Sequence, residues 1–181
     1  MDKKKLGGGA KEMKCTGKEW DHCRVEKMGC FGCHYNENKI YIHYGAKHFD
    51  KNLFQEIKNI PFVKPEGGLW ASDVKAKYGW KQWTEDNCFM TDKYREDNCF
   101  KFKLKENAKI LMLKSKKDLE KLPKYNVPTF DPKLFNWLDF EELKKQYDAI
   151  EILIDQLYWE LYGWDCDSIL ILNKEIIEEV Q

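Results

Sequence analysis

Two short stretches of this chain place a bare backbone beside a ring, an arrangement that suits a flat ligand. His43 is followed by Tyr44 and then by Gly45, so an imidazole lies next to a residue without a side chain. Imidazole and exposed peptide groups can together hydrogen-bond an amide. Gly68 comes just before Trp70, and a glycine there lets the backbone and the indole approach a planar group closely. These residues are candidates for a binding site.

A third stretch brings carboxylates close to the start of an apolar run. Asp165 and Asp167 precede the run Ser168–Leu172 near the end of the chain. Each of the three stretches also has a structural interpretation on its own. The aspartates are typical of a polar turn ahead of a core strand, Trp70 of a core anchor, and His43 of a hydrogen-bonded structural histidine.

A cysteine-rich segment near the N-terminus is the candidate metal site. Cys30 and Cys33 have the Cys-x-x-Cys spacing that lets two thiolates bind one Zn²⁺ ion. Cys15 and Cys23 are separated by seven residues, so the second half of such a site is irregular. This spacing favours free, buried thiols, and a small zinc knuckle built from these four cysteines is the alternative.

The elements that must position these groups are short strands and a turn. Ile42 and Tyr44 fall on one face of a strand expected over Lys39–Tyr44, and His43 falls on the other. Pro65 and the pair Gly67-Gly68 predict a chain reversal before a short element at Leu69. The run Ser168–Leu172 is apolar enough for a strand buried on both faces.

The rest of the chain alternates between strand and helix patterns, which predicts an α+β fold of about five strands with several short helices. Near the turn, Trp80 belongs to a short helix with a bend at Gly79. Glu85–Phe89 recurs as Glu96–Phe100, which indicates a local duplication that lengthens one loop. The further expected elements are helices over Phe49–Ile60, Asp73–Trp83, Ser115–Leu122, Phe140–Tyr147 and Gln156–Gly163, strands over Phe100–Lys105, Lys109–Leu113 and Ala149–Ile154, and a helix or strand over Lys174–Val180. Asp50 and Ser115 are the expected caps of the first and third of these helices, with Asp118 in the first turn of the latter.

Composition narrows the function classes. The 181 residues contain 31 basic and 31 acidic side chains, so the formal net charge is zero. This balance argues against a general nucleic-acid coat or a polybasic membrane binder. No run approaches the ~18 apolar residues of a membrane span, and no signal sequence is recognisable. We therefore expect a cytoplasmic protein with no membrane partner, whose seven cysteines are mostly reduced.

Taken together, the three stretches resemble the mono-ADP-ribosyltransferase superfamily, including its diphtheria-toxin-like and poly-ADP-ribose-polymerase-like branch. In that family one strand carries a His followed closely by a Gly, a second segment reads Gly-Leu/Ile-Tyr-Phe-Ala, and a third strand begins with an acidic residue. The matching segments here are Tyr41–Gly45, Gly68–Ser72 and Asp165–Asn173, in the same order. The Gly-Gly-Leu-Trp-Ala-Ser phrase is also similar to phage and low-GC bacterial proteins.

The resemblance implies an NAD-binding core made of a small split β-sheet with peripheral helices. His43 would bond the ribose hydroxyl next to nicotinamide, and the backbone of Tyr44 or Gly45 would hold the carboxamide. Trp70 would stack on the nicotinamide ring in the place of the family's Tyr. The other residues expected to bind NAD are Gly68, Ser72 and Trp80.

The resemblance also implies an acidic residue that stabilises the positive charge formed when the nicotinamide bond breaks. Asp167 is the first candidate, because it lies nearest the buried strand, and Asp165 is the second. Both are Asp where the family usually has Glu. Because Asp is about one CH₂ shorter, this departure leaves open a transferase, an NAD hydrolase and an inactive binder.

The resulting hypothesis is an NAD-consuming ADP-ribosyltransferase, a glycosyltransferase of the phage or bacterial effector type, acting on a protein, nucleic acid or small molecule. The first alternative is a binding module that recognises a nucleotide or a partner without turnover. The second is an interaction protein whose functional part is a zinc-stapled arm. The expected organisation is a disordered tail over 1–12, a Cys-rich arm over 13–38 and the transferase-like domain over 39–181.

Overall fold

A computed structural model of the chain describes residues 39–61, 64–126, 137–154, 157, 160, 161 and 163–180. The tail and the Cys-rich arm expected before residue 39 lie outside the described residues. So does most of the helix expected over Gln156–Gly163. No described helix is long and apolar enough to cross a lipid bilayer.

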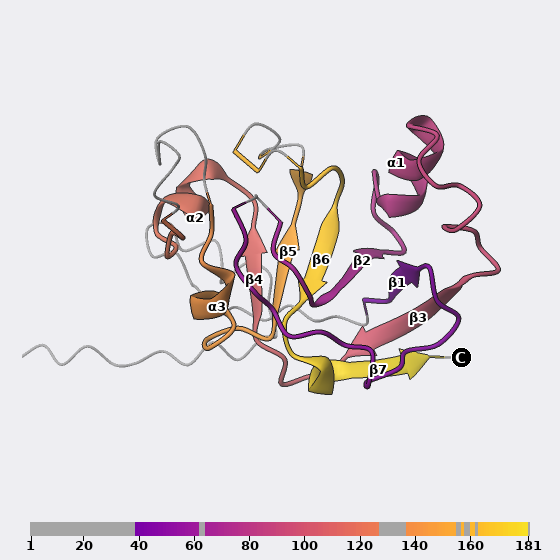
Figure 1. Ribbon diagram of the computed structural model, residues 1–181, viewed down its shortest axis with the longest axis horizontal. Helices are drawn as coiled ribbons and strands as arrows, with labels where there is room; N and C mark the ends of the chain where they lie inside the picture. Colours follow the sequence, from indigo (N-terminus) through magenta and orange to yellow (C-terminus); the bar gives the residue numbers. More distant parts are fainter. Residues whose placement is uncertain are drawn as a thin grey trace, which may run out of the picture.

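Within the described residues, seven strands form one mixed sheet in the order β4-β5-β6-β2-β1-β3-β7, which confirms the α+β class (Figure 1). Only β4 and β5 run parallel, and the other neighbours are antiparallel. Figure 1 shows β4, β5 and β6 on one side of β2, and β1, β3 and β7 on the other. We call these groups the β4–β6 wing and the β1–β3–β7 wing. The strands are β1 (Tyr41–Tyr44), β2 (Leu69–Asp73), β3 (Cys99–Leu104), β4 (Ile110–Leu113), β5 (Ala149–Ile152), β6 (Ser168–Ile171) and β7 (Ile177–Val180).

Strand β2 joins the two wings, and its two halves pair with different neighbours. Its first part pairs with β6, where Trp70 faces Leu170. Its last part pairs with β1, where Ser72 faces Ile42. The wings therefore diverge along a single strand of five residues.

The two glycines before β2 have a backbone conformation and close neighbours that disfavour any side chain. Gly67 and Gly68 have φ of +79° and +69°, which L side chains rarely adopt. A Cβ on Gly68 would lie 2.7 Å from both the Ile171 carbonyl oxygen and Leu170 Cδ1. The turn predicted from the double glycine thus brings β2 directly against β6.

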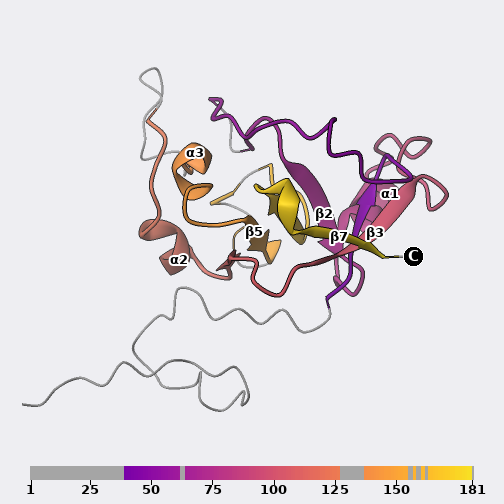
Figure 2. The same ribbon diagram turned by 90° about the horizontal axis from the view of Figure 1, so that it is seen from below.

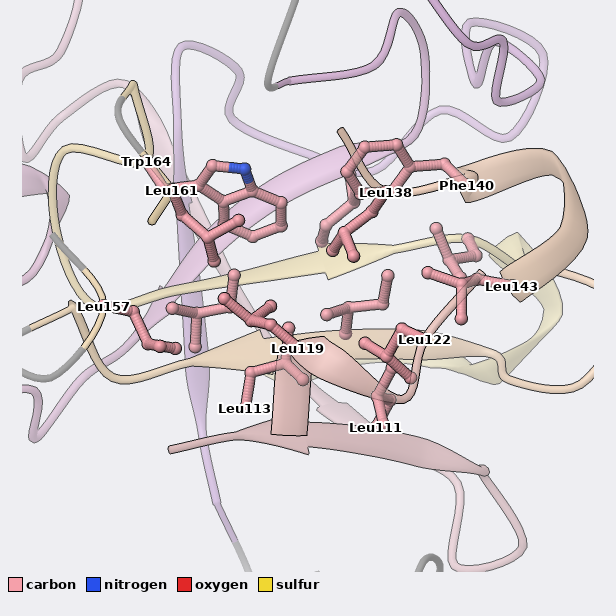
Figure 3. Packing of buried hydrophobic residues seen from close by; sticks show 14 of the residues in the cluster. Leu111, Leu113, Leu119, Leu122, Leu138, Phe140, Leu143, Leu157, Leu161 and Trp164 are labelled. Atoms are coloured by element: carbon pink, nitrogen blue, oxygen red, sulfur yellow. The ribbon is translucent and has the colours of Figure 1, made fainter. Parts of the chain in front are cut away.

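Alternate residues of the β4–β6 wing belong to two hydrophobic clusters. Leu111, Ile150 and Leu170 pack in a first cluster with α2, α3 and the buried Trp164 (Figure 3). Ala149 and Ile169 pack in a second cluster that also contains side chains of the β1–β3–β7 wing. The wing is therefore covered on both faces, as the continuous apolar run in β6 predicts.

In the part of the chain that the structure describes, the helices are few and short. α1 (Trp80–Asp86) begins after Gly79, so the expected bend is the start of this helix. α2 (Lys116–Glu120) has the predicted capping box of Ser115 and Asp118. α3 (Phe140–Leu143) is shorter than the helix expected to Tyr147. In both ribbon views α2 and α3 lie beside the β4–β6 wing, while α1 lies at the other end of the molecule (Figure 2).

The helix expected over Phe49–Ile60 is wrong. This segment contains turns and one isolated bridge, Lys58 to Glu66. The Asp50 carboxylate accepts from the Asn52 N–H in a local turn instead of capping a helix, and the Gln55 carbonyl accepts from Gly68 N–H. Backbone groups that a helix would use internally are therefore bonded to the turn before β2.

The start of one other expected helix is corrected, and the choice between helix and strand left open at the C-terminus is resolved. The helix expected over Asp73–Trp83 does not start at Asp73, which is the last residue of β2. The C-terminal segment holds a 3₁₀ turn at Lys174–Ile176 and then β7, which pairs with β3. The sheet therefore has more strands than the sequence patterns indicated.

Candidate functional site

A cavity of about 340 Å³ lies where β1 and β6 separate along β2. Residues from all three predicted stretches line it, although they are far apart in the sequence. Of the residues expected to bind or act on a ligand, His43, Tyr44, Gly45, Gly68, Trp70, Trp80 and Asp165 line the cavity. Ser72 and Asp167 are not among its lining residues.

His43 is fixed by a hydrogen bond to β2. Its Nδ1 lies 2.7 Å from the Trp70 carbonyl oxygen, and because a carbonyl only accepts, Nδ1–H is the donor. Burial lowers the pKa of His43 below its usual value, an effect that the bond to Trp70 opposes and nearby Lys93 reinforces. The neutral ring then carries its lone pair on Nε2, which can accept a hydrogen bond from a hydroxyl group.

Gly45 has a φ of +110°, and its N–H donates to the Asn98 carbonyl over 2.8 Å. A Cβ at this position would lie 3.5 Å from Cε1 of Tyr94, whose ring lines the cavity. Since the N–H already has a partner, the carbonyl oxygen is the Gly45 group that a ligand amide would meet.

The indole rings in the cavity wall are held by other aromatic rings. Trp70 contacts the buried Trp164 edge to face, with centroids 4.6 Å apart. Trp80 stacks on Trp83 at 5.0 Å and meets Tyr94 edge to face at 5.4 Å. This packing fixes both Trp70 and Trp80, so each can present a ring to a ligand without first being ordered.

Asp165 and Lys64 form an ion pair in the cavity wall. Lys64 Nζ lies 2.7 Å from Asp165 Oδ2, and both side chains are about one third exposed, at 35% and 28%. The same ammonium group lies over the Trp70 ring at 5.5 Å and over the Trp80 ring at 5.8 Å. A carboxylate and two indole faces therefore surround one cation.

Asp167 is occupied with structural bonds. Its carboxylate accepts from the Ile154 N–H over 2.9 Å, and its own N–H donates to the Tyr78 carbonyl. Its carbonyl accepts from the hydroxyl of Ser72, which in turn accepts from the Trp80 N–H. Ser72 and Asp167 thus connect β2, β6 and the start of α1, and they support the cavity wall instead of forming it.

Four lining residues with polar side chains were missed by the sequence analysis: Lys64, Lys93, Tyr94 and Ser168. Lys93 and Tyr94 fall between the two copies of the duplicated Glu-Asp-Asn-Cys-Phe segment, so the expected loop extension forms part of the wall. Lys64 directly precedes the glycine turn, but no local pattern indicated that its partner would be Asp165.

No cysteine is among the described residues that line the cavity. Burial raises the pKa of Cys166 to about 11, so its thiol is protonated near neutral pH and is a poor nucleophile. Cys15, Cys23, Cys30 and Cys33 lie outside the described residues. Within the described part of the chain, no group of three or more His, Cys, Asp or Glu side chains is placed to hold a metal ion.

Comparisons of the chain with protein-family models, with curated proteins and with solved structures gave no match. The geometry of the cavity and the motif resemblance are therefore the grounds for a functional proposal.

Proposed function

We propose that this chain cleaves the nicotinamide–ribose bond of NAD and transfers ADP-ribose to an acceptor. One observation carries the proposal: His43, Gly45, Trp70 and Asp165, from three distant segments, line one cavity. These are the positions at which the resemblance to ADP-ribosyltransferases implies contacts with the nicotinamide half of NAD. The order of the motifs along the chain predicts that these residues lie close together, but it does not require them to share one cavity.

In this proposal His43 accepts a hydrogen bond from a ribose hydroxyl through Nε2, while its Nδ1–H bond to Trp70 fixes the ring. Trp70 stacks on the nicotinamide ring, and the Gly45 backbone meets the carboxamide. Asp165 takes the acidic role, because it lines the cavity, whereas the Asp167 carboxylate is bonded to Ile154 N–H.

The reaction breaks the bond between the nicotinamide nitrogen and the ribose anomeric carbon. The electron pair of that bond leaves with neutral nicotinamide, and positive charge develops on the ribose. The Asp165 carboxylate stabilises this charge electrostatically. An acceptor oxygen or nitrogen then forms a bond to the anomeric carbon and gives up its proton to solvent or to a nearby base; with water as acceptor the product is free ADP-ribose.

The size of the cavity limits what it encloses. Pockets for small molecules span about 300–1,000 Å³, and this cavity of about 340 Å³ lies at the lower end. It is suited to the nicotinamide and its ribose, with the adenosine half extending beyond it. Lys64 and Lys93, the two basic residues of the wall, are available to the diphosphate between the halves.

The Lys64–Asp165 ion pair favours a second candidate, a module that binds a nucleotide without turnover. An acidic residue that keeps its lysine partner cannot give its full charge to the ribose, and Asp reaches less far than Glu. The two candidates share the cavity and differ only in whether nicotinamide is released.

Nicotinamide release from NAD by the purified full chain tests the proposal. We expect release by the wild type, retention of activity in Trp70→Tyr, and a loss of about tenfold or more in Trp70→Ala, because the ring contact is removed. Thermal unfolding of each variant controls for folding. NAD binding without release supports the second candidate, whereas no release and no rise in melting temperature with NAD contradicts both.

A further inference from the structure

We propose that Lys64 is an internal occupant of a cation site between Trp70, Trp80 and Asp165, and that a cationic ring must displace it to enter. The identification of that ring as the pyridinium of NAD rests on the proposed function. The site itself rests on the contacts of one ammonium group: a carboxylate oxygen at 2.7 Å and two indole centroids at 5.5 and 5.8 Å.

The arrangement around Lys64 is the one proteins use to recognise organic cations. Aromatic faces within about 6 Å attract a positive charge through the ring quadrupole, and a carboxylate adds direct Coulomb attraction. Both distances to the rings of Trp70 and Trp80 fall inside that limit. A neutral ring of the same shape gains the stacking contact but neither of the charge interactions.

The walls of the site are held independently of Lys64. The Trp70 ring packs on Trp164, and the Trp80 ring packs on Trp83. The Trp80 backbone N–H is also bonded to the Ser72 hydroxyl over 2.9 Å. Removal of the Lys64 side chain therefore leaves the two indole faces in place as preformed walls, and it leaves the Asp165 carboxylate without this cation.

Lys64 is suited to leave this site. Its side chain is 35% exposed and has a flexible four-carbon stem, so its ammonium group can reach solvent by rotation about side-chain bonds. The other cation in the wall, Lys93, lies over Tyr94 at 5.4 Å and occupies a different position. Among the described residues, Lys64 is the cation that pairs with Asp165, so its departure frees the carboxylate for a ligand.

Competition by Lys64 has a measurable consequence. A ligand that needs the site empty binds with its intrinsic affinity multiplied by the fraction of time that the site is empty. If Lys64 fills it about nine-tenths of the time, removal of Lys64 tightens the binding of a cationic ring by about tenfold. A neutral ring gains less, because it has no attraction to the Asp165 carboxylate and can stack on an indole face while Lys64 keeps its ion pair, so it does not need the site empty.

The experiment compares 1-methylnicotinamide, a permanent cation, with neutral nicotinamide, using the full chain and titration calorimetry. The variants are Lys64→Ala and Lys93→Ala, which remove one positive charge each from the same cavity. We expect Lys64→Ala to bind 1-methylnicotinamide about tenfold more tightly than the wild type, with neutral nicotinamide changed by less than about threefold. Lys93→Ala should change the affinity for the cation by less than about threefold.

Equal gains in the two lysine variants would overturn the proposal, since they would report a general charge effect and not displacement. Weaker binding by Lys64→Ala, or no binding of the cation by any variant, would also overturn it. Lys64→Arg keeps a cation over the rings and should bind the probe no more tightly than the wild type, which provides a test if the alanine variant does not fold. Binding as expected without NAD cleavage would support the cation site and contradict the transferase.

Discussion

The Nδ1 atom of His43 and the carbonyl oxygen of Trp70 lie 2.7 Å apart, which ties β1 to β2 at the point where the two wings diverge. Two residues expected to contact one ligand therefore also position each other. The bond uses the Trp70 carbonyl, so the tautomer of His43 is set by the fold. Any ligand meets an imidazole whose orientation and tautomer are already fixed.

Asp165 and Asp167 should behave differently in a catalytic assay. Asp165→Asn keeps the shape but removes the charge in the cavity wall, so nicotinamide release should fall by about 10²-fold or more. Asp167→Asn keeps an oxygen that can accept from Ile154 N–H, so its rate should stay within about threefold of the wild type. Initial rates at saturating NAD measure both, and the opposite order would assign the acidic role to Asp167.

The stability of the protein should fall at mildly acidic pH because of His43. Burial lowers the pKa of its ring in the folded state, so the unfolded chain takes up a proton first as the pH falls below the ordinary value of 6.5. His43 therefore contributes full stability above that value and loses it as the pH falls from there toward the lower, folded-state pKa.

The measurement is urea unfolding at pH 7.5 and pH 5 for the wild type and for His43→Gln. The difference between the two pH values should shrink in His43→Gln, whose side chain does not titrate. The expectation fails if His43→Gln keeps the wild-type difference between the two pH values.

Gly68→Ala should destabilise the fold more than Gly163→Ala. Both glycines have positive φ, at +69° and +102°, and an alanine there costs about 1–2 kcal/mol in backbone strain. At Gly68 the Cβ also lies 2.7 Å from the Ile171 carbonyl oxygen, whereas at Gly163 nothing lies within 4 Å. We expect Gly68→Ala to cost about 3 kcal/mol or more in the free energy of unfolding. Chemical denaturation measures both, and equal losses would show that the contact with β6 relaxes.

The buried carboxylate of Glu151 should depend on Lys39. Lys39 Nζ lies 2.7 Å from Glu151 Oε1, and the Tyr41 hydroxyl donates to the other oxygen at 3.3 Å. Lys39→Met leaves this charge without its cation and should cost about 2 kcal/mol in the free energy of unfolding. Adding Glu151→Gln should recover part of the loss. Lys51→Met, which breaks the exposed pair with Glu175, should have no measurable effect, and a loss there of similar size would contradict the argument.

The short strands and one helix cap could be predicted because their signals are local. The alternation of side chains around His43 predicts β1, and the apolar run that begins at Ser168 predicts β6. Ser115 and Asp118 predict the cap of α2. The helix over Phe49–Ile60 failed because its periodic apolar residues serve separate purposes. Ile57 packs in one cluster, Phe54 lies against the other, and Leu53 is 77% exposed.

The composition of the cavity could be predicted only in part. The motif order placed Trp70 and His43 correctly in one wall, but it favoured Asp167, which lies two residues from Asp165 and bonds to the backbone of Ile154 instead. Lys64 could not have been found by spacing, because its partner is 101 residues away. Such a contact depends on how the two wings meet, and no local pattern in the sequence encodes that.

Because both wings share strand β2, the cavity lies within one continuous sheet and not between two separate domains. Trp70 belongs to the part of β2 that pairs with β6, and Ser72 to the part that pairs with β1. The parts of the wall that come from β1 and β6 are therefore held to each other through a few covalently linked residues of β2. A ligand that enters the cavity would meet walls that are already in place, and little of its binding energy would be used to close the protein around it.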